Sequence, residues 1–122
     1  MIEGHFGSDG ELFFESELIA ADGLELPVTA MLDTGFTELL AVNSQDLEGL
    51  GWNFLRERQL RTAQGITIFR IYLGKIRLDQ QEFEIPVYAG EEITEVLLGS
   101  QWLKTMRLFA DMASGVLTLG RI

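Results

Sequence analysis

Short runs in which apolar and polar residues alternate follow one another along most of the chain. A period of two residues is typical of a strand with one buried face. Two such runs, residues 11–20 and residues 25–32, flank the turn signal Ala21-Asp22-Gly23, so the pattern predicts a β-hairpin. The first run has candidate buried positions at Leu12, Phe14 and Leu18, and the second places Leu26, Val28, Ala30 and Leu32 on one face.

The remainder of the chain keeps the same short period. It predicts further strands over residues 37–42, 52–63, 66–74, 75–79, 82–88, 96–98, 108–111 and 116–119. Two short helices are predicted between them. Asn43 or Ser44 would cap the first, which ends near Leu50, and Ser100 would cap the second, which runs from Gln101 to about Met106. Many short strands with one or two short helices indicate a mainly β fold, closed and barrel-like.

The domain organisation follows from length and composition. The chain has 122 residues, of which 47% are hydrophobic, which suits one domain with a real core. Residues 1–10 are rich in glycine and polar side chains and are predicted to form a flexible N-terminal segment. Residues 11–122 are then a single domain.

Charge and residue usage exclude several classes of function. The formal net charge is −10 and no Lys/Arg cluster is present, so neither nucleic acid nor an anionic membrane is an expected partner. The chain has no cysteine, and its one histidine, His5, leaves little room for a Ser-His-Asp triad or a zinc site. No apolar run approaches the roughly 18 residues of a membrane span. Because a signal-peptide pattern is also missing, a cytoplasmic protein without metal or cofactor is expected.

One stretch carries candidate chemistry. The apolar strand 28–32 runs directly into Asp33-Thr34-Gly35, and the chain turns apolar again at residues 39–42. A carboxylate between two buried strands is costly unless polar groups solvate it. Thr34 can donate a hydroxyl, and Gly35 lets the backbone turn so that its N–H can reach the carboxylate. An ordinary turn would also use these residue types, so the tripeptide alone leaves both interpretations open.

A second apolar segment ending in glycine follows later in the chain, at Leu97-Leu98-Gly99. The order of the two segments resembles that of the retropepsin-like aspartic peptidases. In that family an apolar strand leads into Asp-Thr-Gly, a flap hairpin follows, and an apolar-apolar-Gly segment passes beneath the Asp loop into a short helix. The resemblance covers residues 11–120, with the flap tip at Ala63-Gln64-Gly65 and the helix carrying Trp102-Leu103.

The resemblance implies an aspartic endopeptidase that cuts a peptide or protein substrate. Such an enzyme needs two paired aspartates, and this chain has a single Asp-Thr-Gly, so the active form would be a homodimer. Asp33 would be the catalytic group, with Thr34 hydrogen-bonded to the partner's loop and the Gly35 N–H bound to the carboxylate. Leu97, Leu98 and Gly99 would support the loop. The residues expected to bind substrate are Phe36, Thr37, Ala63, Gln64, Gly65 and Ile66, and Ile68 is a further candidate pocket wall.

Phe36 departs from the family pattern, because the residue after the glycine is usually small. Two other functions therefore remain open. The first is a catalytically silent retropepsin-like fold that acts as a dimeric module for binding proteins or peptides. The second is an unrelated small β-barrel that binds an apolar ligand, which the alternating strands and a 10% content of aromatic residues allow.

Overall fold

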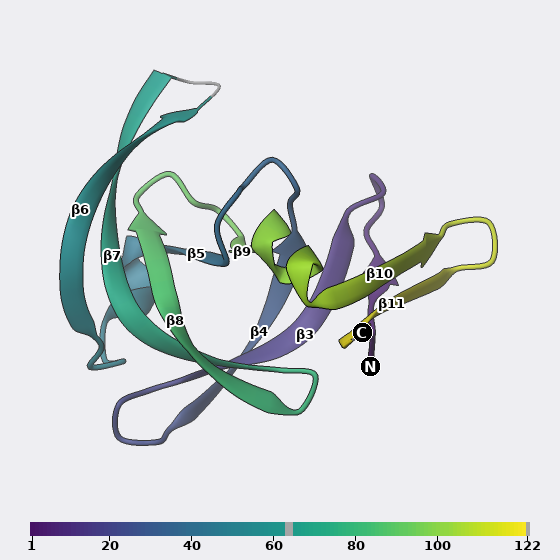
Figure 1. Ribbon diagram of the computed structural model, residues 1–122, viewed down its shortest axis with the longest axis horizontal. Coiled ribbons are helices and arrows are strands. Elements are labelled where there is room, and N and C mark those ends of the chain that lie inside the picture. The colour runs from purple at the N-terminus through teal and green to yellow at the C-terminus, as the bar shows by residue number, and fades with distance from the viewer. Residues whose placement is uncertain (63–64, 122) are drawn as a thin grey trace.

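The computed structural model describes residues 1–62 and 65–121, and it is built almost entirely of β-strands (Figure 1). The strands are β1 (Ile2–Glu3), β2 (His5–Phe6), β3 (Leu12–Ile19), β4 (Glu25–Leu32), β5 (Leu40–Asn43), β6 (Asn53–Thr62), β7 (Gly65–Leu78), β8 (Gln81–Gly90), β9 (Val96–Leu98), β10 (Met106–Asp111) and β11 (Val116–Arg121). Two 3-10 helices, η1 (Ser44–Leu47) and η2 (Ser100–Lys104), complete the described elements.

Six strands close into a barrel. Their order is β3-β4-β9-β5-β8-β7, and β7 pairs with β3 to complete the circle. The closing register brings Leu18 opposite Ile76, and both side chains are buried. Because alternate residues of each strand point inward, aliphatic and aromatic side chains fill the barrel. The pairing of β3 with β7 closes the sheet between these two strands. The expected mainly β, closed and barrel-like fold is confirmed.

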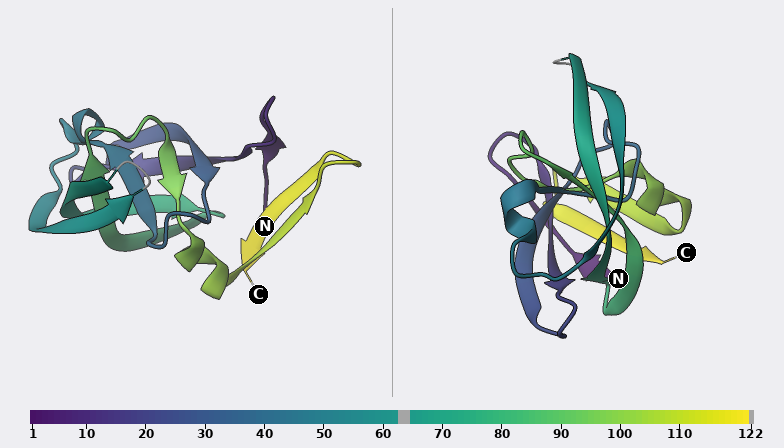
Figure 2. Two further views of the ribbon diagram at one scale, coloured as in Figure 1. Left: turned by 90° about the horizontal axis from the view of Figure 1, so that it is seen from above. Right: turned by 90° about the vertical axis from the view of Figure 1, so that its left-hand side faces the viewer.

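The two ends of the chain meet in a second, smaller sheet. Its order is β1-β11-β10, and the β10–β11 hairpin extends away from the barrel (Figure 2). Residues 1–10, expected to be a flexible segment, instead contribute β1 and β2, which pair with β11 and β3. The Gly4 N–H donates to the Leu117 carbonyl at 2.8 Å. At Gly4 a Cβ would lie 2.7 Å from the Phe14 ring, so the glycines read as signs of flexibility permit close packing instead.

The local elements differ from expectation in three places. The predicted strands 66–74 and 75–79 are one strand, β7, because Gly74 continues the extended chain and makes room for the Trp52 ring. The strand expected from residue 37 begins only at Leu40, since residues 37–39 turn toward Gly99. Both expected helices form as 3-10 helices. No helix in the described part of the chain is long and apolar enough to cross a membrane.

The helix caps are only partly as predicted. Asn43 caps η1, because its Oδ1 accepts a hydrogen bond from the Gln45 N–H at 2.8 Å. Gly99, rather than Ser100, occupies the capping position of η2, and it makes no side-chain cap. The chain can enter η2 without a capping side chain because the Ser100 N–H donates to the Phe36 carbonyl at 2.8 Å.

Strand β9 passes directly beneath the loop that joins β4 to β5. It runs parallel to β4 and antiparallel to β5, with Leu98 opposite both Leu32 and Leu40. The Gly99 N–H donates to the Leu39 carbonyl at 3.0 Å. A Cβ at residue 99 would overlap the Glu38 carbonyl oxygen and lie 2.6 Å from its carbon. Only glycine therefore fits at this crossing of two backbones.

We expect Gly99→Ala to destabilise the protein by about 3 kcal/mol, because two backbone segments would have to separate. Urea unfolding at neutral pH measures this change. Gly115→Ala is the matched control: its φ of +73° strains alanine, but no atom lies within 4 Å of the added Cβ, so the cost is about 1 kcal/mol. Equal losses in the two variants would contradict the backbone crossing.

A network of charges joins the two hairpins that close the barrel. Arg77 of β7 lies 2.6 Å from Glu25, 3.3 Å from Glu17 and 3.1 Å from Glu82. The hydrogen bond from Arg77 lowers the pKa of Glu25 below its ordinary value of 4.5. A carboxylate whose folded pKa is lowered stabilises the fold above its unfolded pKa, and this contribution is lost as the pH falls through the folded value.

We therefore expect Arg77→Met to lower the urea midpoint at about pH 7 and to lower it much less at about pH 3. Parallel unfolding curves of wild type and variant at the two pH values provide the measurement. Arg107→Met, at an exposed position of β10, should shift the midpoint little at either pH. A difference between Arg77→Met and wild type that is the same at both pH values would contradict the role of Glu25.

Candidate active site

Asp33 stands at the point where β4 leaves the barrel. Its N–H donates to the Leu98 carbonyl at 2.9 Å, which extends the parallel pairing of β4 and β9 by one residue. Its side chain is half-buried, whereas Thr34 and Gly35 form an exposed turn. The Gly35 N–H donates to Asp33 Oδ1 at 2.9 Å, and the Phe36 N–H donates to the Asp33 carbonyl at 3.1 Å.

This arrangement gives the two carboxylate oxygens different surroundings. Oδ1 is held by the Gly35 N–H, while Oδ2 has no hydrogen-bond partner within residues 1–62 and 65–121. The Thr34 hydroxyl likewise has none in that part of the chain. The loop thus presents an oriented carboxylate and the Thr34 hydroxyl at the surface. A polar group of a second molecule could approach either of them.

The segment Leu97-Leu98-Gly99 supports this loop from below. Leu98 is fully buried and Leu97 partly so, and each pairs with β4 on one side and β5 on the other. Trp102 of η2 donates its indole N–H to the Leu39 carbonyl at 2.7 Å. The Asp33 loop is therefore fixed by backbone and indole hydrogen bonds from β9 and η2.

Phe36 does not obstruct the Asp33 carboxylate. Its ring meets the ring of Tyr88 edge-on, with centroids 5.8 Å apart, and packs against a cluster of Ala41, Phe69, Ile71 and Tyr88. The bulky residue after Gly35 thus joins a small apolar core between the loop and β8. Thr37, the next residue, is exposed.

Strands β6 and β7 form a long hairpin that rises beside the loop, and we call it the flap hairpin (Figure 1). Thr62 pairs with Gly65, whose φ of +111° only glycine adopts readily. Ile66 and Ile68 are exposed on β7. The expected tip residues Ala63 and Gln64 lie outside the described residues.

A charged contact that the sequence analysis did not identify joins the flap hairpin to the Asp33 loop. Nη1 of Arg58, on β6, lies 2.7 Å from Oε1 of Glu38 and 2.7 Å from the Tyr88 hydroxyl. The hydrogen bonds to Tyr88 and Glu38 raise the pKa of Arg58. A usable sequence signal was the position of Arg58 two residues before the partly buried Leu60, on the same face of β6.

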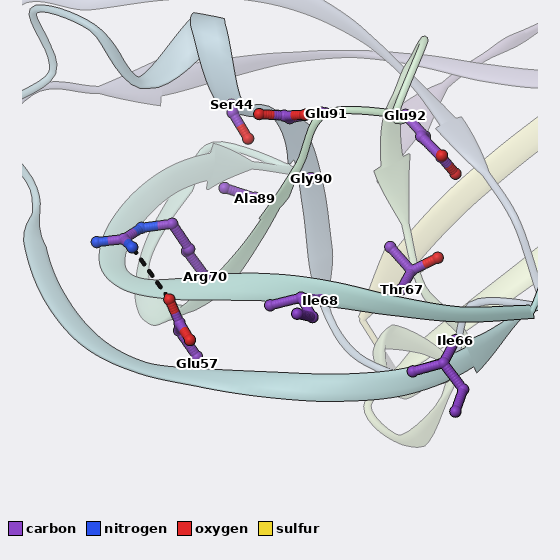
Figure 3. Close-up of a pocket in the computed structure, with 10 residues that line it drawn as sticks. All are labelled: Ser44, Glu57, Ile66, Thr67, Ile68, Arg70, Ala89, Gly90, Glu91 and Glu92. Atoms are coloured by element: carbon purple, nitrogen blue, oxygen red, sulfur yellow. Dashed lines mark hydrogen bonds and ion pairs between the residues drawn. The ribbon is translucent and has the colours of Figure 1, made fainter.

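The flap hairpin also borders a cleft of about 420 Å³ (Figure 3). Ile66, Thr67 and Ile68 line it from β7, facing Gly90, Glu91 and Glu92. Neither Asp33, Thr34 nor Gly35 lines this cleft, so this cleft does not join the expected catalytic residues to Ile66. No group of three or more metal-ligating side chains lies together in the described part of the chain.

Comparisons with known proteins give no sequence match but a clear structural one. No family model matches the chain, and no curated protein matches it. A retropepsin-like aspartic protease from Rickettsia conorii superposes with a TM-score of 0.62 at 19% identity, over 98% of this chain and 88% of that one. The EIAV protease in complex with an inhibitor also gives 0.62, at 14% identity over 81% and 90% of the two chains. The simian foamy virus protease gives 0.53, at 20% identity over 75% and 94%.

These identities are too low to transfer an activity, but the superpositions cover most of each chain. Together with the closed barrel, the Asp33 loop above β9 and the flap hairpin, they establish the architecture. The chain therefore has the fold of the retropepsin-like aspartic proteases.

Proposed function

We propose that this chain is an aspartic endopeptidase that acts as a homodimer on a peptide or protein substrate. The observation that carries the proposal is the Asp33 carboxylate, which is half-buried and held at one oxygen by the Gly35 N–H, at the loop of a retropepsin-like fold. Each chain would supply one Asp33, and the pair would activate a water molecule against a peptide bond.

Carboxylate catalysis of this kind needs two groups in different protonation states. One accepts a proton from the attacking water, and the other donates one to the carbonyl oxygen or the leaving amine. Two carboxylates about 4 Å apart repel by about 4 kcal/mol at an effective dielectric constant near 20, which separates their titrations by about three pK units. This shared proton is the established behaviour of aspartic proteases in general.

The single chain holds only half of this arrangement. It contains one Asp-Thr-Gly, and residues 1–62 and 65–121 form one barrel with a small second sheet rather than two lobes. The exposed Thr34 hydroxyl, which has no hydrogen-bond partner in the described part of the chain, is available to the loop of a second copy. A twofold axis beside the loop would place two Asp33 carboxylates face to face.

The flap hairpin would hold the substrate. An extended peptide can pair with strand edges through its backbone, and its side chains then enter pockets on alternate sides. Ile66 and Ile68 offer exposed apolar surface on β7 for such contacts. Closure of two flap hairpins over the peptide would exclude water from the carboxylate pair.

We expect Asp33→Asn to reduce peptide cleavage by at least about 10³-fold, because an amide can neither share nor transfer the catalytic proton. The fold should persist, since the Asn Oδ1 can still accept the Gly35 N–H. Cleavage of a random peptide library at mildly acidic pH, read by mass spectrometry with and without pepstatin, gives the measurement. Circular dichroism checks the fold.

Asp46→Asn is the matched control, because Asp46 is an exposed aspartate of η1, outside the Asp33 loop. It should leave cleavage and pepstatin inhibition unchanged. Cleavage by Asp33→Asn at the wild-type rate would rule out the peptidase. A folded wild-type chain that binds library peptides without cutting them would instead support the silent binding module.

A further inference from the structure

Three residues from separate segments form a contact between the flap hairpin and the Asp33 loop, and we call Glu38, Arg58 and Tyr88 the flap latch. Arg58 belongs to β6, Glu38 to the loop after Asp33, and Tyr88 to β8. One guanidinium nitrogen, Nη1, lies 2.7 Å from both acceptors. The guanidinium carbon also lies 6.0 Å from the centre of the Tyr88 ring.

Both acceptors of Arg58 are fixed in place. The Glu38 backbone lies against Gly99, where a Cβ would overlap its carbonyl oxygen. The Tyr88 side chain is buried, and its ring contacts the rings of Phe36 and Phe69. Because the Tyr88 side chain is buried and the Glu38 backbone is held, a displacement of β6 at Arg58 that exceeds the reach of the Arg58 and Glu38 side chains must break these hydrogen bonds or shift the loop.

A mobile surface ion pair contributes little to stability, but this pair is partly enclosed. The Glu38 side chain is 25% exposed and that of Arg58 45% exposed. Hydrogen bonds to a charged donor are stronger than neutral ones, and here a single cation serves two acceptors on two different elements. The Arg58 guanidinium therefore bridges the flap hairpin, the Asp33 loop and β8.

We propose that Arg58 is a positioning residue that couples the flap hairpin to the Asp33 loop. With the latch formed, the base of the flap hairpin is held against the loop and Asp33 keeps its orientation. With the latch broken, both the hairpin and the loop gain freedom. The effect on cleavage rests on the proposed peptidase function, whereas the mechanical coupling does not.

A second ion pair on the same hairpin provides a matched comparison. Arg70 Nη1 lies 3.1 Å from Glu57 Oε1, and the two side chains are 50% and 56% exposed. Arg70 and Glu57 are cross-strand partners on β7 and β6, so this pair joins the two strands of the flap hairpin to each other (Figure 3). Its loss should loosen the hairpin alone.

Amide hydrogen exchange on the full-length protein tests the coupling directly. We expect Arg58→Met to speed exchange of the protected amides in residues 33–39 by about threefold to tenfold, and Glu38→Gln to act in the same direction. Combining the two should add little, because each removes the same contact. Arg70→Met should leave exchange in residues 33–39 unchanged.

Rescue separates the latch from a general loss of packing. The charge-swapped double variant, Glu38→Arg with Arg58→Glu, should restore much of the protection in residues 33–39. Unchanged exchange there in Arg58→Met, or an equal rise in Arg70→Met, would overturn the latch. So would a charge-swapped variant that exchanges as fast as Arg58→Met although it is folded by circular dichroism.

Kinetics provide a second readout. Because a loosened loop misplaces Asp33, Arg58→Met should lower kcat by about tenfold, and Arg58→Lys should recover part of it. A rise in KM with unchanged kcat would show that Arg58 only contacts substrate and would overturn the positioning role. A wild-type chain without peptidase activity would refute the proposed function, and the exchange comparison would still decide the latch.

Discussion

Strand β9 lies so close beneath the Asp33 loop that two backbones touch, and the rest of the site depends on this contact. At the start of the loop the Asp33 N–H donates to the Leu98 carbonyl, and at its end the Leu39 carbonyl accepts from the Gly99 N–H. A side chain at residue 99 would separate the two segments. Because hydrogen bonds hold the loop at both ends, its backbone has little conformational freedom. The Gly35 N–H then suffices to orient the Asp33 carboxylate.

Local patterns of the sequence predicted the elements built from neighbouring residues. The period of two gave the hairpin of β3 and β4, because its two strands are joined by a short turn. The residue types of Asp33-Thr34-Gly35 indicated the turn at the end of β4, whereas the passage of Leu97-Leu98-Gly99 beneath the loop was implied by the resemblance to the retropepsin-like family.

Features that depend on distant pairing could not be predicted in this way. The strands β1 and β2 form only because β11 and β3 offer edges far along the chain. Arg58 has its two acceptors 20 and 30 residues away, and the nearby Leu60 indicates the face of β6 on which Arg58 lies but not the acceptors. Local sequence patterns also cannot predict how the two carboxylates of the proposed enzyme would pair, since the second one would come from another copy of the chain.

The structure thus combines a fixed barrel with a flap hairpin that extends from it through β7. The barrel, including β9, and η2 fix the Asp33 loop. The flap hairpin carries exposed isoleucines and meets the loop through Arg58 and through the packing of Phe36 against Phe69 and Ile71. In a homodimer this division would let the hairpins admit substrate while the carboxylates stay in place. In the proposed mechanism, the single Asp33 of one chain would catalyse no cleavage until a second chain binds and supplies the other carboxylate.

Mixed dimers provide the most direct measurement of that dependence. Wild-type chains and Asp33→Asn chains are unfolded together in equal amounts, refolded, and assayed for peptide cleavage against wild type refolded at the same total concentration. If both carboxylates of a dimer are required, activity follows the square of the wild-type fraction, so the mixture retains about one quarter of the wild-type rate. A mixture that retains about one half would show that each chain works by itself and would contradict the paired site.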